Sequence, residues 1–153
     1  MSTSNEPDAR LWDARHFIYA FWVENERPPT AQDAANALEI SIERARALYD
    51  ELNARHALML MPGTHTIRMA NPFSGVPTGF RVRVGSKQYY ANCAWDSFGI
   101  PAALHGDATI EAFCAETQEP RRFRTENGNV RGDSAVIYFR LPFAQWYDDL
   151  VFT

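Results

Sequence analysis

The sequence has no long hydrophobic run. Its longest uninterrupted apolar stretch, Phe17–Val23, is seven residues, whereas a membrane-spanning helix needs roughly 18–20. The amino terminus, Met-Ser-Thr-Ser-Asn-Glu-Pro-Asp, has neither the basic nor the apolar region of a secretory signal peptide. We therefore expect no transmembrane segment and a cytoplasmic location.

Cysteine and positive charge are also scarce. Two cysteines, Cys93 and Cys114, are too few for a disulfide framework or a four-thiolate zinc site, and in a reducing cytoplasm they should be free thiols. The 15 basic residues against 19 acidic residues give a net charge of −4. This balance disfavours nonspecific attraction to nucleic acid or to an anionic membrane, and we expect neither as a partner.

Material for a folded core is abundant. The chain has 153 residues, of which 46% are apolar, and it contains 10 Phe, 6 Tyr and 4 Trp. This length suits one ordinary domain or two small lobes that share an interface. The composition excludes intrinsic disorder of the whole chain.

The first seventy residues predict three helices followed by a hairpin. Apolar residues at helical spacing indicate a helix that ends at Arg27-Pro28-Pro29. Thr30 and Asp33 resemble a capping box, with Asp in place of Glu or Gln, that opens a short second helix, and Ser41 caps a third. A strand, a turn and a strand fit residues 58–69. This order is typical of a winged helix-turn-helix.

A stretch rich in Pro, Gly and Ser, residues 71–79, marks a boundary between two parts of the chain. We expect a winged-helix-like helical lobe at 1–72 and a mostly antiparallel β core at 73–153, giving an α+β fold. A short helix in the core should cover Asn92–Phe98, stopped by Gly99 and Pro101. The strands expected here are Phe80–Val84, a partner that begins at Lys87, Ala108–Ala115, Arg121–Thr125 and Ala135–Leu141.

The short helix carries the residues best suited to chemistry. In its first turn, Cys93 would meet free backbone N–H groups and the positive end of the helix dipole, which favour a thiolate. Asp96 follows three residues later, on the same helical face. A thiolate beside a carboxyl group is a nucleophile or metal ligand next to a proton carrier. Buried cysteines and acidic residues in first helical turns are also common for structural reasons, so the spacing alone leaves both interpretations open.

This segment resembles a known family. Tyr89–Leu104, which opens with Tyr-Tyr-Ala-Asn-Cys-Ala-Trp-Asp, together with Thr109–Thr117, is similar to alkylmercury lyase, the organomercurial lyase of mercury resistance. That family also carries a helical, winged-helix-like lobe before a mixed sheet core. The resemblance implies that Cys93 captures the mercury of an organomercurial and that Asp96 delivers a proton to the leaving carbon.

The implied reaction is protonolysis of a carbon–mercury bond. It releases a hydrocarbon, requires no cofactor and leaves Hg(II) as the bound product on Cys93 and Asp96, from which an external thiol removes it. Mercury is soft and prefers thiolate ligands. Because Asp has an ordinary pKa of about 3.9, a proton source at neutral pH requires burial or a proton released from a thiol. Trp95 and the nearby aromatic residues Tyr89, Tyr90 and Phe98 are candidates for a low-dielectric wall.

One departure from the family pattern bears on activity. The resemblance implies a second catalytic thiol near the carboxyl end, and the corresponding run, residues 145–153, stops just before it. One hypothesis is a chain truncated before a cysteine or selenocysteine. The other is that Cys114, which matches a family cysteine considered structural, substitutes as the partner thiol and so becomes a mercury ligand. With Cys93 alone, the chain would bind an organomercurial but cleave it poorly, so whether it is an active enzyme stays open.

Two non-enzymatic functions are the alternatives. A winged-helix transcriptional regulator would use the third helix, which offers Arg44 and Arg46 but also Glu43. Residues 1–70 hold seven basic and ten acidic residues, and DNA binding normally needs a basic footprint, so we expect a structural lobe. The other alternative is a soft-metal or thiol-sensing module in which Cys93 and Cys114 ligate an ion without turnover.

Overall fold

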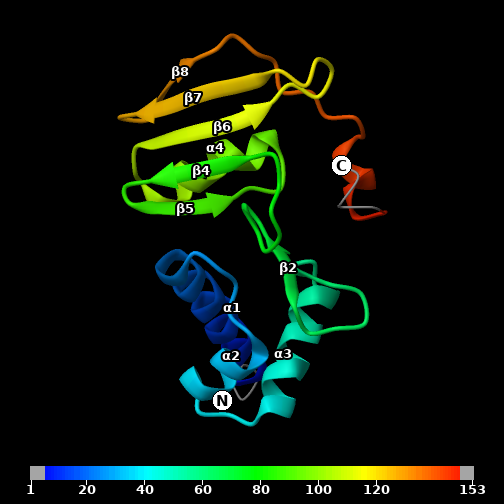
Figure 1. Ribbon diagram of the computed structural model, residues 1–153. Coiled ribbons are helices and arrows are strands. Elements are labelled where there is room, and N and C mark those ends of the chain that lie inside the picture. The colour runs from blue at the N-terminus through cyan, green and yellow to red at the C-terminus, as the bar shows by residue number, and fades with distance from the viewer. Residues whose placement is uncertain (1–5, 149–153) are drawn as a thin grey trace, which may run out of the picture.

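A computed structural model describes residues 6–148 of the chain as two lobes. Figure 1 shows the helical lobe at one end and the large sheet at the other, with β2 between them. The first lobe contains α1 (Glu6–Asn25), α2 (Ala31–Ala37), α3 (Ile42–Ala54), β1 (Met59–Leu60), β2 (Ile67–Ala70) and β3 (Phe73–Ser74). The second contains β4 (Arg81–Val84), β5 (Lys87–Tyr90), α4 (Ala94–Leu104), β6 (Ala108–Phe113), β7 (Pro120–Glu126), β8 (Asn129–Gly132) and the 3₁₀ helix η1 (Phe143–Asp148).

The three helices follow the expected pattern. α1 buries one face, on which Leu11, Ala14, Ile18 and Trp22 are at most 1% exposed. The predicted capping box is confirmed: the Thr30 hydroxyl accepts from the Asp33 N–H, and the Asp33 carboxylate accepts from the Thr30 N–H. The Ser41 hydroxyl caps α3 by accepting from a backbone N–H. α2 and α3 therefore begin where a side-chain oxygen satisfies free backbone donors. α1 is held by the apolar stripe that faces the core.

The small sheet of the first lobe also reaches the second. β2 pairs in antiparallel fashion with β1 and with β3. Phe73 of β3 bridges Ala91, and its ring stacks 5.6 Å from that of Trp22 and lies edge-on, 5.3 Å from that of Tyr89. β3 thus lies just beyond the expected boundary at residue 72, yet it belongs to the first sheet, and one buried ring joins the two cores.

The large sheet is antiparallel throughout, in the order β5-β4-β6-β7-β8. Its inner face packs against α4, and Val82, Ile110 and Ile100 are fully buried between them. The alternate residues, such as Arg83 and Arg124, face solvent. The expected α+β architecture with a mostly antiparallel core is therefore observed.

The carboxyl end of α1 is fastened to β5. The Lys87 ammonium donates to the backbone carbonyls of Val23 and Glu24 at 3.1 and 3.0 Å, and the Tyr89 hydroxyl donates to the Val23 carbonyl at 2.7 Å. The Gln88 N–H donates to the Glu26 carboxylate at 2.8 Å. A cation at the carboxyl end of a helix complements its dipole, so these bonds fix α1 against the edge of the large sheet.

The prediction that Gly99 and Pro101 stop the site helix is wrong. α4 runs through both residues to Leu104 and ends with His105 in the left-handed region at φ 50°. A Cβ at Gly99 would lie 3.2 Å from the Cβ of Pro72, so this glycine permits close packing and does not end the helix. Pro101 lacks an N–H, but it is buried against the sheet, and packing outweighs the lost hydrogen bond.

The strand expected at Ala135–Leu141 is also wrong. Asn127 and Gly128, both with positive φ, turn the chain directly from β7 into β8. Residues 135–141 then run without strand structure, and Val136 and Tyr138 are 91% and 81% exposed. Alternating hydrophobicity forms a strand only where a partner and a covered face exist, and this segment has neither among residues 6–148.

Residues 133–148, here called the C-terminal arm, contact both lobes. Phe139 meets Trp95 of α4 edge-on at 6.0 Å and stacks on Trp146 at 5.2 Å. Tyr147 stacks on His56, just beyond α3, at 4.1 Å. Figure 1 shows this arm leaving the large sheet and descending toward the first lobe. The arm is therefore held by aromatic contacts to both lobes.

Candidate functional site

Cys93 is the N-cap of α4, one position before the first turn in which the sequence places it. Its backbone is extended, and its Sγ accepts a hydrogen bond from the Asp96 N–H at 3.5 Å. The preceding backbone is anchored because the Thr78 hydroxyl donates to the Ala91 carbonyl at 2.6 Å. The sulfur is thus held at a helix start, where free N–H groups converge.

Asp96 belongs to a hydrogen-bonded cluster that joins α4 to the first lobe. Its Oδ2 accepts from the Asn92 amide at 3.1 Å, and the same amide nitrogen donates to the Asn71 side chain at 3.1 Å. The Asn71 carbonyl accepts from the Tyr19 hydroxyl at 2.9 Å. The Arg15 guanidinium lies 4.9 Å from the centroid of the Tyr19 ring. These groups come from α1, the segment between β2 and β3, and the start of α4.

Burial raises the pKa of the Asp96 carboxyl group above its ordinary value, although hydrogen bonds from Asn92 and Cys93 oppose this shift. The same carboxyl group raises the pKa of Tyr19, for which burial is the larger cause. A buried carboxyl group that receives a proton from a neighbouring thiol holds that proton to a higher pH than an exposed one. Asp96 therefore has the environment that a proton carrier requires.

Cys93 departs from the expectation of a thiolate. Burial raises the pKa of its thiol, and the negative charge of Asp96 raises it further, whereas the N–H groups of Asp96 and Trp95 lower it. Desolvation thus outweighs the helix start. The environment of Cys93 therefore favours the neutral thiol over the thiolate.

Cys114 lies in the connection between β6 and β7. Its backbone N–H donates to the Glu119 carbonyl at 2.9 Å. Hydrogen bonds from the Thr117 hydroxyl and from the N–H groups of Thr117 and Glu116 lower the pKa of its thiol, and Arg121 contributes in the same direction. Cys114 is therefore the thiol with the greater tendency to ionise.

The register of the sheet places the two cysteines at the same end of the core. Tyr90 pairs with Arg81, and Arg81 pairs with Glu111. Tyr90 and Glu111 therefore lie on strands two positions apart, about 10 Å across the sheet, and Cys93 and Cys114 each follow three residues later in the chain. Both are free thiols. Within residues 6–148, no group of three or more His, Cys, Asp or Glu side chains is arranged to hold a metal ion.

The aromatic wall differs from expectation. Tyr89 is 2% exposed and belongs to the core, whereas Trp95 is 59% exposed and meets the C-terminal arm. The run at 145–153, after which the resemblance implies a second thiol, extends past residue 148 and lies partly outside the described residues. Sequence reasoning missed Arg15, Tyr19 and Asn71, because they reach the site only through the tertiary fold.

A family model described as alkylmercury lyase matches residues 73–152. Among solved structures, the chain is similar to the mercury-bound form of MerB2, with a TM-score of 0.63 and 21% sequence identity. The similarity covers 78% of this chain and 58% of that one, so the chain spans little more than half of the solved structure. At this identity the likeness shows the fold alone. No curated protein matches the sequence, and no helix among residues 6–148 is long and apolar enough to cross a membrane.

Proposed function

The chain belongs to the alkylmercury lyase family, and on this basis we propose that it captures organomercurials on Cys93 and protonates their carbon from Asp96. One observation carries this proposal: the Asp96 N–H donates to the Cys93 Sγ at 3.5 Å while the Asp96 carboxyl group is held beside the same sulfur. A soft ligand and a proton carrier therefore face one small volume.

The first step is exchange at mercury. As the Cys93 sulfur binds R–Hg–X, a sulfur–mercury bond forms, the mercury–X bond breaks and X leaves as an anion. The thiol proton passes to the Asp96 carboxylate, which stands three residues along the same helix start. Burial favours the neutral carboxyl group that results. The raised pKa of Cys93 is therefore compatible with capture, because the acceptor for its proton is in contact.

The second step is protonolysis. The Asp96 carboxyl group gives its proton to the carbon, the electron pair of the carbon–mercury bond forms the new C–H bond, and the hydrocarbon leaves. Mercury stays on Cys93 as Hg(II), with the Asp96 carboxylate as a weaker oxygen ligand. External thiols then take the metal, and one of their protons returns to the Cys93 sulfur. Positioning the acid beside the metal avoids an encounter with a proton donor from solvent.

We propose Cys114 as a separate mercury-binding thiol. Its lowered pKa favours the thiolate that mercury prefers, but the register sets it two strands away from Cys93. Cys114→Ser is expected to reduce the number of mercury ions bound per chain and to leave hydrocarbon release unchanged. A loss of release in this variant would instead assign Cys114 as the partner thiol of Cys93.

The decisive experiment is incubation with phenylmercury and an excess of a free thiol, with benzene measured in the headspace. The intact chain should release benzene. Cys93→Ser should neither bind mercury at the site nor release benzene, whereas Asp96→Asn should bind mercury without release. Cys114→Ser is the matched control for loss of a thiol. Tight binding by the intact chain without benzene would favour the second candidate, a soft-metal or thiol-sensing module.

For the first lobe, residues 1–72, we propose a winged-helix-like module with a structural role. The bonds from Lys87, Gln88 and Tyr89 to the end of α1 support this role, as does the cluster that links Tyr19 to the Asp96 carboxyl group. A gel-shift assay at low salt should detect no tight duplex binding. We propose a cytoplasmic location, where thiols that accept mercury are abundant, and cell fractionation tests it.

A further inference from the structure

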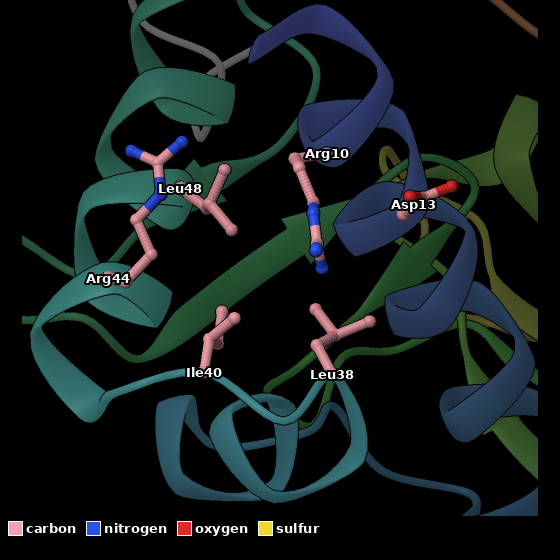
Figure 2. A pocket seen from close by; sticks show the side chains of 6 residues that line it. All are labelled: Arg10, Asp13, Leu38, Ile40, Arg44 and Leu48. Atoms are coloured by element: carbon pink, nitrogen blue, oxygen red, sulfur yellow. The ribbon is translucent and has the colours of Figure 1, made fainter. Parts of the chain in front are cut away.

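A cavity of about 220 Å³ opens in the helical lobe. It lies between α1, the connection from α2 to α3, and α3, and it shares no lining residue with the cluster around Cys93. Its apolar side chains are Leu38, Ile40 and Leu48 (Figure 2). Leu48 is 1% exposed, whereas Leu38 and Ile40 are half-buried, so two large aliphatic side chains keep a free surface toward the cavity.

The same cavity carries two positive charges. Arg10 of α1 and Arg44 of α3 line it, both are exposed, and neither side chain makes an ion pair with a residue in the described range 6–148. Figure 2 shows the Arg10 guanidinium reaching into the space between the helices, while Asp13, the acidic lining residue, points away from it. In the same view the Arg44 guanidinium is turned away from that space, so Arg10 is the cation that reaches into the cavity and Arg44 adds positive charge at its edge.

We propose that this cavity binds a small amphipathic carboxylate of about the size of benzoate. Its carboxylate would pair with the Arg10 guanidinium, with Arg44 adding a second charge at the rim. Its apolar body would cover Leu38, Ile40 and Leu48. Guanidinium groups are the preferred partners of carboxylates because of their planar, forked donors, and burial of the ring removes exposed aliphatic surface from water.

The volume limits the class of ligand. A cavity of about 150 Å³ holds benzene, so about 220 Å³ accommodates one ring with a carboxylate. Pockets for drug-sized ligands typically measure about 300–1,000 Å³, so this smaller cavity suits a ligand below that size. Acetate carries the charge without the apolar body, and benzyl alcohol carries the ring without the charge. These two molecules separate the two halves of the proposal.

The test is a titration of the full-length chain with sodium benzoate, followed by amide chemical shifts and without mercury. Saturable shifts confined to α1, the α2–α3 connection and α3 are expected. Arg10→Gln should weaken binding about tenfold, because a charge-assisted hydrogen bond is lost, and Arg44→Gln should weaken it less. The matched control, Arg46→Gln, changes an exposed arginine of α3 that does not line the cavity and should bind as the parent does.

Leu38→Phe fills the cavity and should abolish the shifts. Arg10→Gln keeps the fold and leaves the cavity open, so it tests the charge separately. Benzyl alcohol and acetate should each bind at least about tenfold more weakly than benzoate. The proposal is overturned if benzoate gives no saturable shifts, if Arg10→Gln binds as tightly as the parent, or if acetate matches benzoate. Cys93→Ser should bind benzoate normally, so the result is independent of the lyase function.

Discussion

The backbone N–H of Asp96 donates to the sulfur of Cys93 at 3.5 Å, so the proposed proton carrier also helps to position the proposed mercury ligand. The negative charge of the Asp96 carboxylate in turn raises the pKa of the thiol, for which burial is the larger cause. Two residues three positions apart thus form a closed pair at the start of α4. Their relative position is set mainly by helix geometry, which makes the pair less dependent on the rest of the fold.

Replacement of Asp96 by Asn should stabilise the folded protein while ending protonolysis. Burial raises the pKa of this carboxyl group, so between its ordinary and its raised pKa the folded state binds more protons than the unfolded state. Stability from this group is therefore lost as pH rises through that window. Asp96→Asn should raise the free energy of unfolding at pH 7 by about 1 kcal/mol.

Urea denaturation at several pH values checks this prediction. The gain for Asp96→Asn over the parent should shrink as the pH falls from the raised pKa toward the ordinary pKa of Asp, and it should be lost below the ordinary pKa, where the carboxyl group is neutral in both states. A variant that is less stable than the parent at pH 7, or a gain that does not change with pH, would contradict it.

Alkylation should distinguish the two cysteines. Iodoacetamide reacts with thiolates, and the pKa of Cys114 is lowered whereas that of Cys93 is raised. At pH 7.5, peptide mass spectrometry should find Cys114 modified first. Thr117→Val, which removes the hydroxyl donor, should slow this reaction. Faster labelling of Cys93 in the parent chain would refute the assignment.

The amide of Asn92 should position the Asp96 carboxyl group, to which it donates at 3.1 Å. Asn92→Ala is expected to reduce benzene release about tenfold, because the acid loses a hydrogen bond that orients it. Capture of mercury by Cys93 should persist. Single-turnover kinetics with phenylmercury separates the two, and Asn36→Ala, an exposed change in α2, is the control. Equal loss of capture and release would assign a structural role to Asn92.

The hydroxyl of Tyr89 should contribute to the stability of the junction between the lobes. It donates to the Val23 carbonyl at 2.7 Å, and the residue is 2% exposed. Tyr89→Phe should lower the free energy of unfolding by about 1 kcal/mol, because the bond is lost in a buried setting. Tyr138→Phe, at a residue 81% exposed, should change it little. Chemical denaturation measures both variants.

Local signals predicted most of the fold. The sequence predicted the capping box at Thr30 and Asp33 and the cap at Ser41, because caps depend on residues close in sequence. The end of α4 was predicted wrongly from Gly99 and Pro101. Their packing in the folded protein outweighs their tendency to end helices. Ala135–Leu141 misled because a strand depends on partners that its own pattern does not reveal.

The site was predictable to the same extent. The spacing of Cys93 and Asp96 placed both at the start of one helix. The sequence could not predict the direction in which the pKa of Cys93 shifts, because that direction depends on burial in the folded protein. Tyr19 and Asn71 stand 52 residues apart and meet through one hydrogen bond, for which the sequence offers no periodic signal.

The bond from the Gln88 N–H to the Glu26 carboxylate has a consequence for behaviour in concentrated solution. β5 is an outer strand of the large sheet, and outer strands offer unpaired donors to strands of other molecules. Here the Glu26 carboxylate of the first lobe accepts from one of those donors, the Gln88 N–H, and so places a negative charge at this edge of the sheet. The contact that joins the lobes therefore also occupies part of the border at which a strand of another molecule could pair.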